Sequence, residues 1–158
     1  MQKILFTLTV AMVTVYPGFW PDFNFAYKRG DSTNIDKNFI RDDGKQIVLD
    51  QKSEKIYTDV KSSSQMSYAD AVKYCKNMDY LGYASWRLPK KEEMRSLLEL
   101  SRRDITVKHA FKNVQQGIYW ASTTNRRGDA WYFDFDLGRY STADKSKAFY
   151  VLCVGEKK

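Results

Sequence analysis

Residues 67–78 read Ser-Tyr-Ala-Asp-Ala-Val-Lys-Tyr-Cys-Lys-Asn-Met and have the clearest helical pattern in the chain. Ser67, with Asp70 three residues later, is typical of a helix start, because a serine hydroxyl accepts a backbone N–H that the first helical turn leaves unpaired. Apolar residues then recur at helical spacing, and Cys75 is one of them. The pattern predicts a first helix with Cys75 on its buried face.

A strand pair is predicted before this helix, and a second helix after it. Residues 46–50 and 55–58 are apolar segments separated by a polar loop, which indicates a hairpin. Pro89 suits the first turn of a helix whose inner side runs from Met94 to Ser101. Arg102 and Arg103 are then expected at its C-terminal end, where positive charge favours the helix dipole.

The last third of the chain has a strand-like pattern. Strands are expected at residues 118–122, 130–136 and 148–154, separated by polar stretches at 125–129 and 138–147. In the middle strand Trp131, Phe133 and Phe135 alternate with more polar residues that include Asp134 and Asp136, which indicates one solvated face. This order of elements predicts an α+β fold, with two helices beside a small antiparallel sheet.

The composition is that of one folded domain with an excess of positive charge. The 158 residues are 43% hydrophobic and 15% aromatic, which is enough for a core and argues against disorder in most of the chain. The 26 lysine and arginine residues exceed the 19 acidic residues and give a net charge of +7. This charge favours anionic partners, although solubility alone explains it equally well.

The N-terminal residues are typical of an export signal. A basic start at residues 1–3 precedes an apolar run at 4–16, which Pro17 and Gly18 end. We expect a signal peptide at 1–26 without a clean cleavage site, a linker at 27–38 and the domain at 39–158. The run is short for a membrane span, and a buried N-terminal strand or helix is the alternative. An export signal implies the periplasm, the cell surface or secretion.

Two cysteines, Cys75 and Cys153, lie far apart and have no metal-binding spacing. In an exported protein two cysteines suggest one disulfide. Two buried free thiols are the alternative, and they become the better interpretation if the leader is not a signal.

Catalytic and metal-binding patterns are not evident. His109 is the single histidine, and Ser122 lacks the Gly-x-Ser-x-Gly context of a nucleophile elbow. Asp134 and Asp136, with Asp129 nearby, have the oxygen ligands of a hard cation, but a solvated strand face is the more common explanation for such acids. We therefore predict a protein that is not an enzyme and that needs no cofactor or metal.

Basic residues after the second helix are the best candidates for ligand binding. The planar guanidinium of arginine suits sulfate, phosphate and carboxylate groups. Trp120 and Trp131 can stack on sugar rings, or they can belong to the core. The candidate anion-binding residues are Arg102, Arg103, Lys108, Arg126, Arg127 and Arg139.

Several motifs resemble a bacterial domain family that also forms the C-terminal domain of the Legionella collagen-like adhesin. The resemblance covers about residues 39–154. Its most specific motifs are Trp86-Arg87-Leu88-Pro89, Tyr119-Trp120-Ala121-Ser122 and Cys153-Val154. The resemblance implies a C-type-lectin-like fold closed by one disulfide between a cysteine of the first helix and a cysteine of the last strand. Cys75 and Cys153 match those places.

The sequence also departs from the patterns that this resemblance suggests. Ser85 replaces the usual Asp, and Lys90 replaces the usual Thr, which removes a helix cap. The triplets with which animal C-type lectins bind calcium and sugar, Gln-Pro-Asp or Glu-Pro-Asn with Trp-Asn-Asp, do not occur in the sequence. The expected ligand is therefore bound without calcium.

Two functions fit these observations. The resemblance implies sulfated glycosaminoglycans, so the first hypothesis is an exported, adhesin-like module that binds an acidic or sulfated polysaccharide through basic loops. The second is a structural or assembly module of the cell envelope, a possible homo-oligomer without a ligand of its own. The export signal argues against nucleic acid as a partner, and no membrane span is expected after processing.

Overall fold

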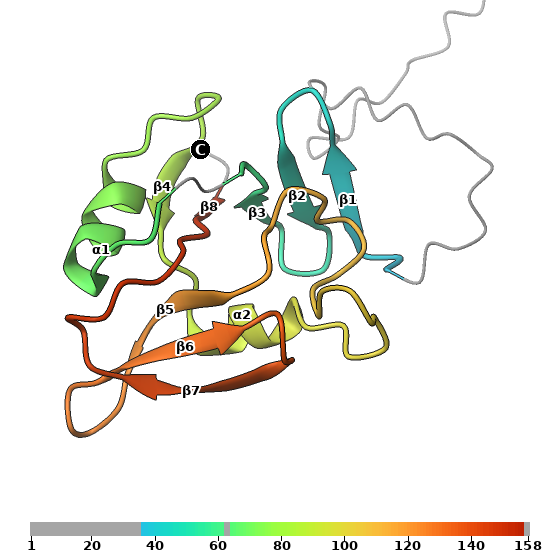
Figure 1. The fold of residues 1–158 in the computed structure, drawn as a ribbon. Coiled ribbons are helices and arrows are strands. Elements are labelled where there is room, and N and C mark those ends of the chain that lie inside the picture. The colour runs from blue at the N-terminus through green and yellow to red at the C-terminus, as the bar shows by residue number, and fades with distance from the viewer. Residues whose placement is uncertain (1–35, 62–63, 157–158) are drawn as a thin grey trace, which may run out of the picture.

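Two antiparallel sheets and two short helices form the fold, as Figure 1 shows. The computed structural model describes residues 36–61 and 64–156. The predicted signal peptide (1–26) and most of the predicted linker (27–38) lie outside the described residues. The predicted α+β class is confirmed, but the strands divide between two sheets of five and three strands rather than forming one small sheet.

The five-stranded sheet has the order β1-β2-β3-β8-β4. Its strands are β1 (Phe39–Asp42), β2 (Ile47–Asp50), β3 (Lys55–Thr58), β8 (Val154–Glu156) and β4 (Ala84–Arg87). The predicted hairpin is confirmed, since β2 and β3 pair with Val48 opposite Tyr57. β1 is a strand that the sequence pattern did not indicate. β8 lies between β3 and β4, so the last strand of the chain is an interior strand of this sheet.

The three-stranded sheet is built from consecutive strands, β5 (Ile118–Thr124), β6 (Ala130–Asp134) and β7 (Arg139–Ala143). β7 falls in the stretch predicted as a polar connection. The strand predicted at 148–154 is wrong in extent, because only Val154 belongs to β8. The preceding residues cross from one sheet to the other: Tyr150 N–H donates to Ile118 O, whereas Thr58 N–H donates to Cys153 O. Residues 148–153 therefore do not pair with one strand along their whole length.

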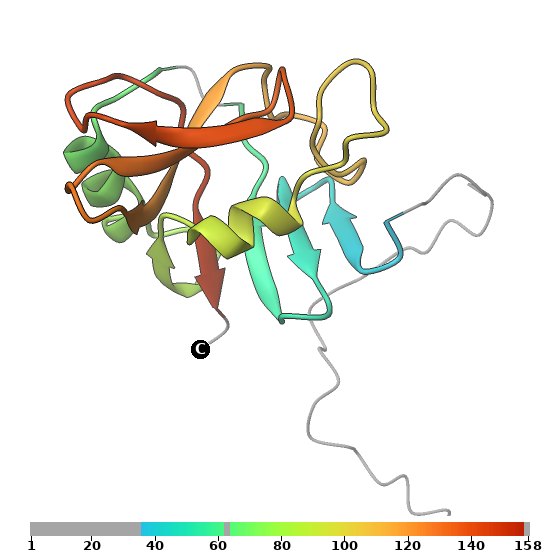
Figure 2. The same cartoon turned by 90° about the horizontal axis from the view of Figure 1, so that it is seen from below.

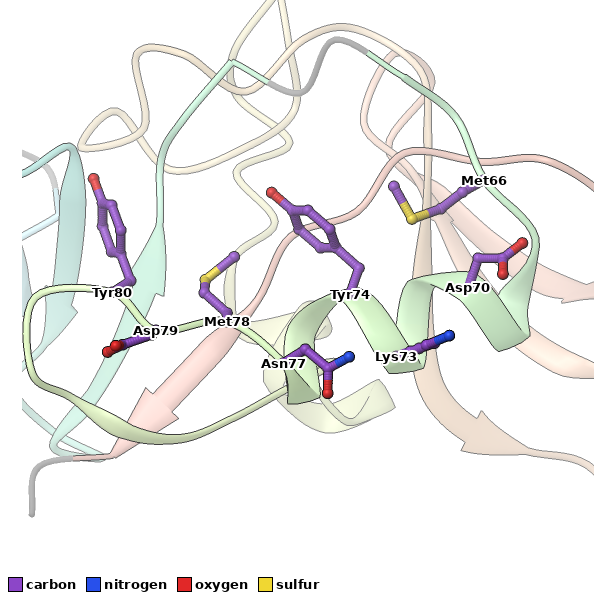
Figure 3. A pocket seen from close by; sticks show the side chains of 8 residues that line it. All are labelled: Met66, Asp70, Lys73, Tyr74, Asn77, Met78, Asp79 and Tyr80. Carbon is purple, nitrogen blue, oxygen red and sulfur yellow. The ribbon is translucent and has the colours of Figure 1, made fainter.

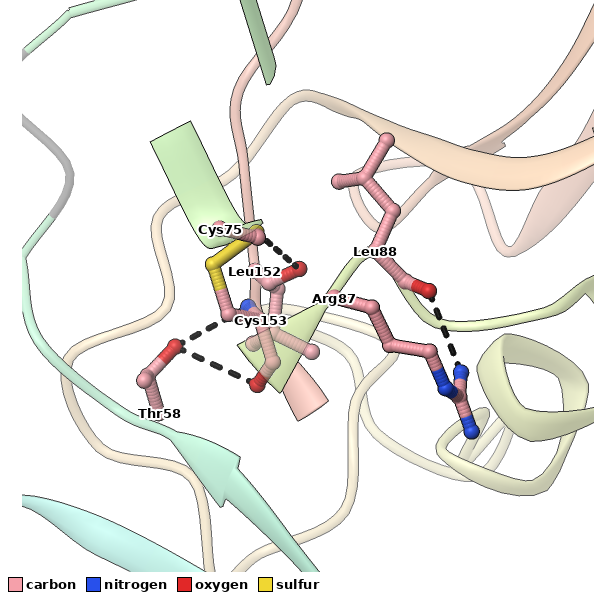
Figure 4. Close-up of a disulfide and its surroundings, with 6 residues drawn as sticks. All are labelled: Thr58, Cys75, Arg87, Leu88, Leu152 and Cys153. Carbon is pink, nitrogen blue, oxygen red and sulfur yellow. Dashed lines mark hydrogen bonds between the residues drawn. A yellow bond between two sulfur atoms is a disulfide. The ribbon is translucent and has the colours of Figure 1, made fainter. Parts of the chain in front are cut away.

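α1 (Tyr68–Lys76) begins where the sequence predicts, and its buried face is confirmed. Ser67 Oγ accepts the Asp70 N–H at 3.3 Å, and Ala71 and Cys75 are buried. A disulfide joins Cys75 to Cys153 with 5.6 Å between the Cα atoms, so the alternative of two free thiols is wrong. Figure 4 shows this bond between α1 and the chain that leads into β8.

α2 (Lys91–Ser96) is shorter than predicted, and Arg102 and Arg103 do not lie at its end. The helix closes at Leu97, whose carbonyl accepts the Lys108 N–H at 2.8 Å. Backbone groups beyond Leu97 pair across a loop rather than along a helix, as the bond from Glu99 N–H to the carbonyl of residue 106 shows. The two arginines therefore belong to a long loop at residues 97–117.

The start of α2 is capped from elsewhere in the molecule. Pro89 precedes the helix instead of lying in its first turn, and the N-cap residue Lys90 supplies no side-chain cap. Thr123 of β5 accepts the Lys91 N–H at 2.9 Å, and Glu93 accepts the Lys90 N–H at 2.6 Å. A hydroxyl from the three-stranded sheet thus replaces the one that residue 90 lacks.

The core fills the space where the two sheets and α2 meet. Tyr57 of β3, Met94 of α2 and Phe133 of β6 belong to one buried cluster, together with Leu97, the C-cap of α2. A second cluster surrounds the disulfide and Trp120. In Figure 2, α2 crosses in front of the five-stranded sheet, with the three-stranded sheet above it. Three of the six predicted cations, Arg126, Arg127 and Arg139, lie on this three-stranded sheet or in its turns.

Candidate anion-binding surface

Arg126 and Arg127 lie at the turn between β5 and β6, and both are exposed. Asn125 shapes this turn, because its Oδ1 accepts the N–H of Arg127 at 2.9 Å and that of Asp129 at 3.0 Å. Its Nδ2 donates to Asp129 Oδ2 at 3.0 Å, so the neighbouring carboxylate is already engaged. Neither guanidinium forms an ion pair with another described residue. The turn therefore presents two exposed arginine side chains that form no ion pair within the described part of the chain.

The remaining predicted arginine of this sheet, Arg139, lies at its opposite end. In the register of β6 and β7, Ala130 pairs with Ala143, and Asp134 pairs with Arg139. Arg139 Nε lies 3.3 Å from Asp134 Oδ2, and its side chain is 69% exposed. The predicted cations therefore occupy two separate places rather than one patch.

Two of the predicted cations are directed inward and hold the long loop together. Arg102 lies 3.0 Å from Asp104 Oδ1 through Nε, and its Nη1 donates to the carbonyl of residue 107 at 3.1 Å. Lys108 Nζ lies 2.9 Å from Glu99 Oε2 and 3.3 Å from Asp36 Oδ1. Their charges are balanced within the molecule. Arg103, between them in sequence, is exposed and has no ion pair in the described part of the chain.

A buried carboxylate, that of Asp59, anchors the same loop to the five-stranded sheet. Its oxygens accept the backbone N–H groups of Lys112 and Asn113 at 3.0 Å and that of Val114 at 3.1 Å. Arg41 of β1 pairs with this carboxylate from the other side. Three consecutive amides and one guanidinium thus converge on a side chain that is 0% exposed. Sequence reasoning missed Asp59, because the three amides that it binds lie more than 50 residues away along the chain.

A cation also lies against two aromatic rings where α2 meets the three-stranded sheet. Lys91 Nζ is 3.4 Å from the ring centroid of Trp131 and 5.4 Å from that of Tyr140. The two ring centroids are 5.9 Å apart, and Trp131 is partly buried. Trp120, in contrast, is fully buried, and its Nε1 donates to the carbonyl of Met66 at 3.0 Å. Trp120 therefore belongs to the core, and Trp131 remains at the surface.

Two lysines that sequence reasoning missed follow β7. Ala143, the last residue of β7, is opposite Ala130, so the chain continues beside the end of the sheet that carries the arginine turn. Lys145 and Lys147 come next and are exposed. Their charge was visible in the sequence, but the stretch at 138–147 was interpreted only as a polar connection.

Of the two acidic residues predicted on a solvated strand face, Asp136 is exposed, whereas the prediction is wrong for Asp134. Asp134 is only 5% exposed, and its Oδ1 accepts the N–H groups of Asp136 and Leu137 at 3.1 and 3.2 Å. It therefore stabilises the turn into β7. Asp129 is engaged by Asn125. Among the described residues, no group of three or more His, Cys, Asp or Glu side chains is placed to hold a metal ion.

Residues of the signature motifs have structural contacts. Arg87 forms a two-point ion pair with Glu93, and the carbonyl of Pro89 accepts the Ser122 N–H at 2.7 Å. Trp86 packs so closely on Gly155 that a Cβ there would lie 2.9 Å from its ring. The other motif side chains, Leu88, Tyr119 and Trp120, are buried. His109 is exposed, and its backbone N–H donates to Asp36.

A shallow hollow lies along the outer side of α1, away from the predicted cations (Figure 3). Tyr74, which is 46% exposed, points into it from the helix. The residues that line it are Met66, Asp70, Lys73, Tyr74, Asn77, Met78, Asp79 and Tyr80. Its single cation and two carboxylates make it a poor place for an anion.

The fold and this surface define a small α+β module that is closed by one disulfide and has unpaired cations on ordered turns. The family model of the Lcl C-terminal domain, which is the C-terminal domain of the Legionella collagen-like protein, matches residues 38–155. The chain belongs to this family. No curated protein matches the chain. Within the described residues, neither helix has the length and apolarity that crossing a membrane requires.

Proposed function

We propose that this protein is an exported, non-enzymatic module that binds an acidic or sulfated glycan without calcium. The observation that supports this function best is the pair Arg126 and Arg127. Both side chains are exposed on a turn that Asn125 orders, and neither is neutralised by a described carboxylate. Arginine binds sulfate and carboxylate groups through parallel hydrogen bonds, and an ordered turn reduces the entropy lost on binding. Membership of a family named for an adhesin-like protein supports the same function.

The proposed fold is of C-type-lectin-like type. In support, the disulfide joins the first helix to the chain beside the last strand, as the resemblance implies. A long loop at 97–117 connects α2 to the three-stranded sheet, and hydrogen bonds to the carboxylate of Asp59 anchor this loop. The predicted boundaries at residues 26 and 38 remain part of this proposal.

The predicted cations have different proposed roles. Arg126 and Arg127 are the main ligand-binding residues, with Lys145 and Lys147 beside them. Arg103 and Arg139 form a second binding site, of lower affinity, at the other end of the sheet. Arg102 and Lys108 support binding indirectly, because their ion pairs shape the loop that presents Arg103.

The test is retention of the oxidised protein on immobilised heparin over a salt series. Arg126→Ala with Arg127→Ala should lower the salt concentration needed for elution, because two counter-charges are lost. Lys37→Ala with Lys52→Ala is the matched control: it removes the same charge from exposed residues near β1 and β2 and should change elution little. Equal losses in both variants would indicate only a general charge effect, and no retention at low salt would refute glycan binding.

A second function, as a structural or assembly module, is supported by exposed apolar side chains. Leu100 and Leu137 are 67% and 57% exposed, and Leu100 lies over Gly138 beside the turn into β7. Assembly through such residues strengthens with salt, whereas binding through arginine weakens. Sedimentation over the same salt series therefore distinguishes the two functions.

A further inference from the structure

We propose that Lys91, Trp131 and Tyr140 form a subsite that binds one anionic sugar ring of the ligand. In this subsite the ring stacks on Tyr140 while its sulfate or carboxylate pairs with Lys91. The inference rests on the proposed function and makes it more specific, because it requires a ligand that has both an anionic group and a ring.

The first argument is the unbalanced charge of Lys91. Its Nζ lies 3.4 Å from the Trp131 ring centroid, and the side chain is only partly exposed. An aromatic face attracts a cation, but it does not neutralise the charge as a carboxylate does. Lys91 has no ion pair within residues 36–61 and 64–156. An incoming sulfate or carboxylate thus meets a positioned ammonium group and displaces no internal acid.

The second argument is the geometry of Tyr140. It lies on β7, the edge strand of the three-stranded sheet, and remains 37% exposed. Its ring is stacked on Phe133 of β6 at a centroid distance of 5.0 Å and an interplanar angle of 28°. Because Phe133 is fully buried, one side of the tyrosine ring is supported by the core. A supported, exposed aromatic ring offers contact area at little entropic cost.

The third argument is the position of this subsite relative to the arginine turn. The Lys91 N–H donates to Thr123 Oγ1 at 2.9 Å, and Arg126 follows Thr123 by only three residues. Arg95, on the same side of α2 as Lys91 by helical spacing, is exposed and also lacks an ion pair among the described residues. Lys91, Arg95 and Arg126 therefore place several cations along the face where α2 meets the sheet. A linear glycan with repeated negative charges can bind more than one of them.

The test compares two linear polyanions, heparin and inorganic polyphosphate, of which only heparin has sugar rings. Tyr140→Ala should weaken heparin binding by about tenfold, the order expected for loss of one stacked ring, and leave polyphosphate binding unchanged. Tyr140→Phe is the matched control, because it keeps the ring and should bind both polymers as the original protein does. Lys91→Met keeps the aliphatic stem and should weaken the binding of both polymers.

Trp131 gives an independent readout. Heparin should change the tryptophan emission of the original protein, and the change should be lost in Trp131→Phe. The subsite is refuted if the original protein binds heparin and Tyr140→Ala binds it equally well. It is also refuted if Tyr140→Ala weakens the binding of heparin and of polyphosphate equally. In both cases the proposed binding by Arg126 and Arg127 is unaffected. If the original protein does not bind heparin at all, both proposals are refuted.

Discussion

Arg87 and Glu93 are joined by two parallel hydrogen bonds, from Nη1 to Oε2 at 2.7 Å and from Nη2 to Oε1 at 2.8 Å, which connect β4 to the first turn of α2. Burial disfavours the charged form of Glu93, but the bonds from Arg87 and from the Lys90 N–H outweigh it and lower its pKa to about 2. The carboxylate is therefore held in its charged form by the fold. Such a shift in pKa makes the stability of the fold depend on pH.

The first prediction concerns this pH dependence. The pKa of Glu93 is lower in the folded protein, at about 2, than its ordinary 4.5. Its contribution to stability is therefore complete above pH 4.5 and is lost as the pH falls towards 2. Glu93→Gln should lower the free energy of unfolding at neutral pH by about 2 kcal/mol and reduce its fall with acid, as measured by urea titration.

Glu92→Gln is the control for this experiment, since Glu92 is exposed, lies in the same helical turn and carries the same charge. It should leave both the free energy of unfolding and its pH dependence nearly unchanged. Equal effects of the two variants would show that the helix dipole, rather than the Arg87 pair, is responsible.

The second prediction concerns the anchor of the long loop. Asp59→Asn removes the buried counter-charge of Arg41, whose side chain is only 9% exposed, and leaves it only the exposed Asp43. We expect a loss of about 3 kcal/mol in the free energy of unfolding and faster hydrogen exchange at the amides of residues 112–114. Asp43→Asn removes the other, 72% exposed partner of Arg41 and should cost less than about 1 kcal/mol. Unchanged exchange at 112–114 would contradict the anchoring role.

The third prediction uses the missing helix cap. Lys90 is the N-cap of α2 with extended backbone angles, φ −68° and ψ 163°, and its side chain provides no cap. A threonine there has a hydroxyl that can accept the Glu93 N–H, so Lys90→Thr should stabilise the protein by about 0.5–1 kcal/mol in urea unfolding. Lys90→Ala removes the lysine without adding the hydroxyl. If the free energy of unfolding rises equally in both variants, the effect comes from the lost positive charge and not from the cap.

The fourth prediction concerns the disulfide. Cys75 and Cys153 are 0% and 1% exposed, so a reductant reaches them only after the surrounding structure opens. The reduction rate, followed by mass, should therefore rise steeply with urea, and the reduced protein should be less stable by about 2–5 kcal/mol. Rapid reduction at a rate independent of urea would contradict this burial.

Local patterns predicted the parts of the fold that depend on local interactions. Ser67 capped a helix, and the hairpin of β2 and β3 followed from two apolar segments around a polar loop. The prediction failed where distant partners decide the structure. α2 ends at Leu97 because the Leu97 carbonyl accepts the N–H of the distant Lys108. The exposed edge strand β7 has too few apolar residues to show a strand pattern.

The candidate site was predicted in residue type more than in arrangement. Arg126 and Arg127 are exposed, as a binding role requires, whereas Arg102 and Lys108 have internal partners that no sequence spacing indicates. Lys91 was not considered, because its importance depends on the ring of Trp131, 40 residues later, which only the folded chain brings within 3.4 Å of it.

The row of paired residues across the five-stranded sheet has a mechanical consequence. Phe39 is opposite Asp50, Asp50 is opposite Lys55, and Lys55 is opposite Glu156. The first residue of β1 and the last residue of β8 therefore lie at the same end of the strands. Tension applied to the domain through these two ends peels the strands apart sideways and breaks their hydrogen bonds one after another. The disulfide then stops the extension, because the 78-residue separation between its cysteines, about 280 Å of contour length, cannot be drawn out. Under load the domain is therefore expected to yield at low force, lengthen by a limited amount and hold.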